Sequence, residues 1–190
     1  MAYNLQDQEQ IDELKAFWAN NGNRLMWLAV IALAVFAGWR AWNWYHDSQA
    51  QDAAREYAGL LSAADSGKIE QVRERYDAIQ KGYGSSVYAG MAGLRAAEAF
   101  AKANQPDAAV AALESVMKNS TEPGFKPIAG VRLAGLLLDQ KKYDEATKAI
   151  DSGNIGPVSG EMAASVADCR GDILAAQGKA SDAKAAWEEA

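Results

Sequence analysis

An uncharged run of fifteen residues, Leu25 to Trp39, constrains this chain more than any other feature of its sequence. A segment in lipid must satisfy its own backbone hydrogen bonds, so a run of this length favours a helix. Continued past Arg40 to Tyr45 at about 1.5 Å per residue, that helix reaches about 31 Å, close to the thickness of a bilayer's hydrocarbon core. The run therefore predicts a single transmembrane helix over residues 24–46.

The flanks of the run support contact with membrane lipid. Tryptophan and tyrosine favour the boundary between lipid and water, and arginine can extend its charged group from the lipid edge to the headgroups. The residues predicted to lie at this interface are Arg24, Trp39, Arg40, Trp42, Trp44 and Tyr45. Basic residues are nearly balanced on the two sides, so charge alone does not decide the orientation of the span.

Two other interpretations of the run fit less well. A cleaved export signal begins with a basic region and ends at small residues, whereas the first 24 residues here hold four acids and bulky aromatic residues follow the run. A helix in the core of a soluble protein would rarely be apolar on every face and also carry four large aromatic residues at one end. A permanent single-pass anchor remains the favoured interpretation.

The segment before the anchor, residues 1–23, is acidic and amphipathic. Ile11, Leu14, Phe17 and Trp18 recur at helical spacing, and Gly22 follows as the expected helix end. We expect a short helix lying at the membrane surface. A solvated segment that frays is an equally good interpretation.

The remainder of the chain contains an internal repeat of 37 residues. Similar stretches begin at Gly93, Gly130 and Ala167, and each reads as an apolar helix, a polar break and a second amphipathic helix. Small residues recur at Ala97, Ala134 and Gly171 and at Ala109, Ala146 and Ala183; large ones recur at Phe100, Leu137 and Leu174 and at Leu113, Ile150 and Trp187. Small residues let paired helices approach closely, and large ones fill the space to the next pair.

One further step of 37 residues backwards places Leu60, Ala63, Val72 and Tyr76 at matching positions, which indicates a degenerate first hairpin. The sequence thus predicts an all-α chain: a transmembrane helix followed by an α-solenoid of helical hairpins over residues 47–190. The expected hairpins cover residues 49–80, 86–118, 126–152 and 160–190. The Gly- and Pro-containing stretches 121–127 and 152–160 are expected loops.

The second halves of the repeats, QKKYDEATKAI and QGKASDAKAAW, resemble tetratricopeptide repeats, although the first-helix Trp and closing Pro of that pattern are missing. With the acidic N-terminal segment and the Gly-Trp-Arg-Ala-Trp edge of the span, the whole chain resembles the YfgM-like family, which are ancillary subunits of the bacterial SecYEG translocon. The resemblance implies an inner-membrane protein with a cytoplasmic N-terminus and a periplasmic repeat domain. It also implies contact with SecYEG, exported polypeptides and a membrane-bound prolyl isomerase of the PpiD type.

The sequence offers little material for catalysis. There is one cysteine, Cys169, and one histidine, His46, which lies at the expected membrane edge. We find no metal-ligand spacing, no phosphate-binding loop and no nucleophile motif, so we expect no cofactor, no metal and no enzymatic activity. The net charge of −6, without a basic stripe, is a poor match for nucleic acid.

Binding is the function that such a fold favours. Stacked hairpins form a concave surface lined by the first helix of each pair. The residues expected to line it and to contact a partner are Tyr88, Met91, Arg95, Arg132 and Asp168. We therefore predict a membrane-tethered, protein-binding scaffold; the alternative is a membrane-anchored sensor that signals through its cytoplasmic segment.

Overall fold

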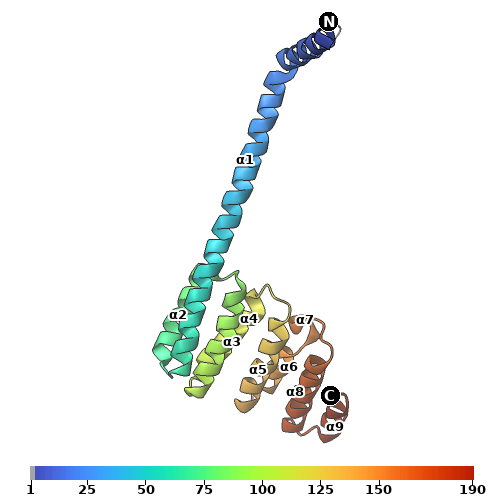
Figure 1. The fold of residues 1–190 in the computed structure, drawn as a ribbon. Coiled ribbons are helices and arrows are strands. Elements are labelled where there is room, and N and C mark those ends of the chain that lie inside the picture. The colour runs from blue at the N-terminus through green and yellow to red at the C-terminus, as the bar shows by residue number, and fades with distance from the viewer. Residues whose placement is uncertain (1–2) are drawn as a thin grey trace. The chain divides into compact units, whose positions relative to one another are not determined.

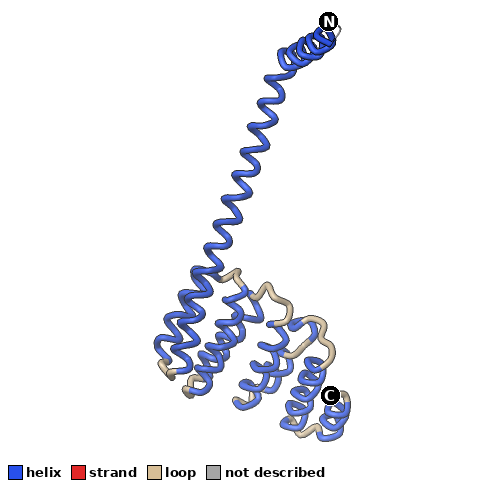
Figure 2. The backbone as a smooth tube through the Cα atoms, viewed as in Figure 1, coloured by secondary structure: helices blue, strands red, loops and turns tan. Residues whose placement is uncertain are grey.

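The computed structural model describes the backbone of residues 3–190, together with their side chains apart from those of 3–10, 12–14 and 44–48. Within this range the chain is helical and forms no strand, which confirms the predicted all-α class (Figure 2). It divides into two compact units, residues 1–48 and 49–190. The helices are α1 (Tyr3–Asp65), α2 (Ile69–Tyr83), α3 (Val87–Lys102), α4 (Pro106–Asn119), α5 (Phe125–Asp139), α6 (Tyr143–Ala149), α7 (Ser152–Ile155), α8 (Glu161–Ala176) and α9 (Ala180–Glu188).

Helix α1 does not end at Gly22, so the predicted helix end was wrong. The helix continues through this glycine into the apolar run. A glycine inside a helix costs only about 0.5–1 kcal/mol relative to alanine, and no proline follows to break the backbone hydrogen bonds. The side chain of Trp18, one turn earlier, lies against Gly22 and helps to bury it.

The second unit is a stack of helical hairpins (Figure 1). The end of α1 pairs with α2, α3 with α4, α5 with α6, and α8 with α9, while α7 is a single turn between the third and fourth pairs. From the second hairpin on, each first helix packs against the second helix of the preceding hairpin, as α4 does with α5. One continuous core runs through the stack.

The turn inside each hairpin has the same backbone geometry. One residue per turn has a positive φ, between 56° and 79°, and these residues are spaced 37 apart: Gly67, Asn104, Lys141 and Gly178. The next residue in each turn donates its backbone N–H to the carbonyl five residues earlier, at 2.8–2.9 Å: Lys68 to Ala63, Gln105 to Phe100, Lys142 to Leu137 and Lys179 to Leu174. This is the Schellman closure of a helix C-terminus, which favours glycine or asparagine at the left-handed position.

The core follows the repeat at most of the expected positions. In each hairpin, the residue four positions after the N-cap of the second helix is fully buried: Val72, Ala109, Ala146 and Ala183. Phe100 and Leu137 are also buried, but the expected Leu174 is only half-buried, and Ile173 takes the core position in α8. The difference is a shift of about 100° around the helix, the angle between consecutive residues.

Glycines allow two of the closest helix contacts. A side chain at Gly93 in α3 would collide with Val116 in α4, and one at Gly130 in α5 would come within 2.6 Å of the carbonyl oxygen of Ala149. Backbone cannot move aside as a flexible side chain can, so Gly130 fixes the distance between α5 and α6.

The left-handed turns give a test of the repeat. In Gly178→Ala, an L-residue must adopt the positive φ, and we expect the free energy of unfolding to fall by about 1–2 kcal/mol. Lys141→Gly removes an existing strained residue, and we expect a gain of up to about 1 kcal/mol. Urea unfolding of the detergent-solubilised protein, followed by far-ultraviolet circular dichroism, measures both changes.

The matched control is Gly82→Ala, since Gly82 lies in α2 with open space around its Cβ position and an ordinary helical φ. This change should raise the free energy of unfolding slightly, because alanine is a better helix former than glycine. Equal destabilisation by Gly178→Ala and Gly82→Ala would contradict the left-handed assignment.

Candidate protein-binding face

The first helices of the second, third and fourth hairpins, α3, α5 and α8, provide the face on which binding was expected. A groove of about 530 Å³ lies between α3 and α5 on this face. We call it the α3–α5 groove. The residues that line it are Ala97, Glu98 and Ala101 from α3, Leu113 from α4, and Arg132, Gly135, Leu136, Leu138 and Asp139 from α5.

The floor and the rim of the groove differ in chemistry. Ala97 and Leu113 are buried beneath it, whereas Leu136 and Leu138 are half-buried and keep apolar surface available. Charged groups at Glu98, Arg132 and Asp139 surround this apolar surface. An apolar site with a few placed polar groups is the usual form of a ligand-binding site.

Arg95 lies close to the groove but is committed to ion pairs within the protein. Its Nη1 donates to Glu98 Oε2 at 2.8 Å, and its Nη2 donates to Asp65 of α1. Lys102 Nζ donates to the other carboxylate oxygen of Glu98 at 2.7 Å. Arg95 therefore joins the first hairpin to the second, and its charge is already balanced.

Glu98 is the centre of this network. Hydrogen bonds from Lys102 and then Arg95 lower the pKa of its carboxyl group from 4.5 to about 2, although partial burial acts in the opposite direction. The hydrogen bond that Arg95 donates to Glu98 is also the largest cause of the raised pKa of Arg95. Glu98 thus remains ionised at any pH near neutrality, and the positive charges of Arg95 and Lys102 balance its negative charge.

Of the other four predicted partner-binding residues, only Arg132 lines the groove. Tyr88 is half-buried and packs on Tyr57 of α1, with ring centroids 5.8 Å apart. Met91 is half-buried on α3, outside the groove lining. Arg132 is exposed within the groove, whereas Asp168 is exposed on α8 and does not line it. The structure therefore brings Arg132 and, through Glu98, Arg95 to one groove, and leaves Asp168 apart.

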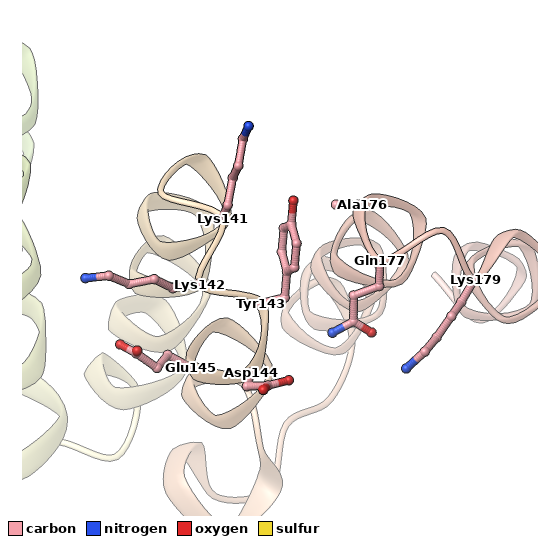
Figure 3. Close-up of a pocket in the computed structure, with 8 residues that line it drawn as sticks. All are labelled: Lys141, Lys142, Tyr143, Asp144, Glu145, Ala176, Gln177 and Lys179. Carbon is pink, nitrogen blue, oxygen red and sulfur yellow. The ribbon is translucent and has the colours of Figure 1, made fainter.

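A second cleft, of about 580 Å³, lies where the turns of the third and fourth hairpins meet (Figure 3). The Tyr143 ring stands between the two turns, while the Lys142 and Glu145 side chains extend to the side away from Gln177 (Figure 3). Its lining is mostly polar and mixes lysines with acids. With so little apolar surface, this cleft is a weaker candidate for polypeptide binding than the α3–α5 groove.

Cys169, the one cysteine of the chain, is buried in α8. Burial, with a smaller effect of Asp172, raises the pKa of its thiol to about 11. The nucleophilic form of cysteine is the thiolate, so Cys169 has little nucleophilic character at neutral pH and acts as a small core residue.

The membrane segment lies in the first unit. Lys15–Asn43 is helical, with a mean hydropathy of 1.7 in its most apolar window, and none of that window is buried. Arg24, Trp39, Arg40 and Trp42 are exposed, as residues facing lipid or headgroups would be. The side chains of the other two predicted interface residues, Trp44 and Tyr45, lie outside the described part of the structure.

Comparison with known proteins decides the family. Residues 15–190 match the model of a tetratricopeptide repeat-like domain. The chain is 31% identical to the ancillary SecYEG translocon subunit of Neisseria gonorrhoeae over 184 residues, which are 96% of this chain and 86% of that protein. This chain belongs to the tetratricopeptide repeat-like family of ancillary SecYEG translocon subunits.

Other members of this translocon-subunit family match over similar lengths. The Escherichia coli protein is 29% identical over 185 residues, covering 96% of this chain and 85% of that protein. The Haemophilus influenzae protein is 25% identical over 192 residues, covering 100% and 91%. The likeness therefore includes both the apolar span and the repeats.

Of the nine residues that line the groove, sequence reasoning named only Arg132 as a binding residue. The charged or open positions that it missed include Glu98, Gly135 and Asp139. A signal for two of them was present, because Glu98 and Gly135 occupy the same position in successive repeats. The sequence shows that equivalence but does not show that the two residues line one groove.

The Glu98 network gives a prediction about pH. Because the pKa of Glu98 is lower in the folded protein, its stabilising contribution is present above about pH 4.5 and is lost as the pH falls towards about 2. We expect Glu98→Gln to lower the free energy of unfolding at pH 7 by about 1 kcal/mol or less, because the pair is partly exposed to solvent. At pH 3 the difference in the free energy of unfolding between the variant and the wild type should be smaller than at pH 7.

Urea midpoints of both proteins at pH 7 and pH 3 check this. Asp168→Asn is the control, because Asp168 is exposed and forms no ion pair with a residue that the structure describes. A Glu98→Gln effect that is the same at both pH values would contradict the network.

Proposed function

We propose that this chain is a membrane-tethered scaffold of the Sec machinery that binds polypeptides through the α3–α5 groove and catalyses no reaction. The observation that carries the proposal is an apolar groove on the first-helix face of a repeat unit whose relatives are named as translocon subunits. The span supports residence in the inner membrane.

The topology belongs to the same proposal. Residues 1–23 lie in the cytoplasm, residues 24–46 span the membrane, and residues 47–190 form the periplasmic repeat domain. In this arrangement the groove meets polypeptides as they leave the translocon. A membrane-bound periplasmic prolyl isomerase of the PpiD type is a further proposed partner, as the family resemblance implies.

Tethering supplies the physical advantage of this arrangement. A groove with a limited apolar floor and few charges binds weakly by itself. Anchoring it beside its source of ligand raises the effective concentration and makes weak contact sufficient. The proposal therefore needs no tight-binding site, and it is compatible with varied exported chains.

Topology can be tested with single engineered cysteines. Ser181→Cys places an exposed thiol on α9, and Gln8→Cys places one in the N-terminal segment, while buried Cys169 should contribute little background. In spheroplasts, a membrane-impermeant maleimide should label the Ser181→Cys protein, and it should label the Gln8→Cys protein only after lysis. The reverse pattern would overturn the proposed orientation.

Binding can be tested by photocrosslinking in intact cells. We expect a benzoyl-phenylalanine probe at Leu138 in the groove to form adducts with a secreted protein arrested in export, and a probe at Ala34 in the span to form adducts with SecYEG. A probe at Lys184, exposed on α9, is the control for random collision. Equal yields at Leu138 and Lys184 would contradict binding in the groove.

The sensor alternative makes a different prediction. Under that function, deletion of residues 1–23 should abolish a cytoplasmic response while leaving the Leu138 adducts intact.

A further inference from the structure

The repeat allows two arginines in the same structural position to be compared. Arg95 in α3 and Arg132 in α5 are 37 residues apart, so they occupy equivalent places in successive first helices. Arg95 is balanced by two carboxylates, Glu98 one turn later and Asp65 in the preceding hairpin. Arg132 forms no ion pair with any residue that the structure describes, and its side chain is exposed.

The sequence explains why Arg132 has no ion-pair partner among the residues that the structure describes. The position three residues later, which holds Glu98 in the earlier repeat, holds Gly135 here. The position equivalent to Asp65 in the preceding hairpin is Lys102, a cation that is itself bonded to Glu98. Both places from which a carboxylate reaches Arg95 therefore lack one for Arg132.

The open space at Gly135 is a second observation. It lies inside α5, where glycine weakens a helix relative to alanine. No turn or packing contact requires it, because a Cβ added there would meet nothing within 4 Å. It lines the α3–α5 groove beside Leu136 and Leu138, so its missing side chain leaves open space above the apolar floor.

We propose that the α3–α5 groove is specific for an extended polypeptide segment that carries one acidic side chain among large apolar residues. The carboxylate of the segment pairs with Arg132, and an adjacent apolar side chain fills the space above Gly135. The bound segment thus supplies the carboxylate that Glu98 supplies to Arg95. This inference rests on the proposed function and adds the chemistry of its ligand.

The other charged groups of the groove limit the ligand to one acid. Glu98 already accepts hydrogen bonds at both of its oxygens, so it offers little attraction to a basic residue. Asp139 lies two turns beyond Arg132, about 10 Å along α5, and forms no ion pair with a described residue. It would repel a second carboxylate, so a run of acids fits less well than a single one.

The test uses the full-length protein in detergent micelles and fluorescently labelled peptides that are acetylated and amidated, so that a side chain supplies the only carboxylate. Three peptides share the core Leu-Phe-X-Leu-Phe between Gly-Ser flanks, with X as Glu, Gln or Lys. Fluorescence anisotropy at 50 mM salt should show about three- to fivefold tighter binding of the Glu peptide than of the Gln peptide, the effect of one ion pair with an exposed arginine.

Variants locate the preference. In Arg132→Gln the Glu and Gln peptides should bind equally, and in Arg132→Glu the Lys peptide should become the preferred one. Gly135→Glu should create an internal pair with Arg132 that copies Arg95–Glu98 and should remove the preference for the Glu peptide. Gly82→Glu, at an open helical glycine in α2, is the matched control and should bind as wild type does.

The outcomes separate this inference from the function on which it rests. If the wild-type protein binds all three peptides equally, the carboxylate specificity is wrong and polypeptide binding stands. If it binds none of them, both proposals are overturned. If Gly135→Glu and Gly82→Glu weaken binding alike, with unchanged circular dichroism, the assignment to Arg132 and Gly135 is wrong.

Discussion

The left-handed turn at the end of each first helix is the constraint on which the repeat unit depends. One residue with positive φ reverses the chain, and the next backbone N–H returns to the carbonyl five residues earlier. Because this closure recurs every 37 residues, each second helix begins at the same angle to its first helix. The fully buried alanines of the second helices and the close contact at Gly130 then follow, since only small residues fit between helices held in this way. Lys141 keeps this geometry without being glycine or asparagine, which shows that packing of the neighbouring helices outweighs the local strain.

Repetition of the backbone makes the side chains on the first-helix face comparable. Where the backbone is constant, a difference in chemistry between equivalent positions has to come from the side chains alone. Arg95 links two hairpins through its ion pairs, whereas Arg132 lines the α3–α5 groove and forms no ion pair with a residue that the structure describes. The decisive change is three residues after each arginine, where the earlier repeat has Glu98 and the next repeat has Gly135. A face assembled in this way can differ in charge from hairpin to hairpin without any cost to the core.

The period, the small-residue positions and the all-α class could be predicted from the sequence, because each depends on local composition and spacing. Other features depend on information that spacing does not carry. Whether α1 ends at Gly22 is set by a balance of about 1 kcal/mol, and whether Ile173 or Leu174 faces the core is set by a rotation of one residue. The partners of Arg95 come from α1 and α3 together, so spacing within α3 alone does not show that Arg95 is already ion-paired. The groove forms between α3 and α5, so its lining depends on how two helices pack and not on the spacing within either one.

The contrast between the two arginines also bears on how a scaffold of this kind can bind varied polypeptides. An ion pair on an exposed surface contributes little to affinity, and an apolar surface contributes affinity without selecting for sequence. A single unbalanced cation beside an apolar groove therefore selects for one chemical feature of the ligand and leaves the rest of its sequence free. Under the proposed function, the membrane span then supplies what the groove lacks, because a tethered site needs only weak affinity to remain occupied close to its ligand source. Weak contact also allows rapid release, which a protein that meets successive exported chains requires.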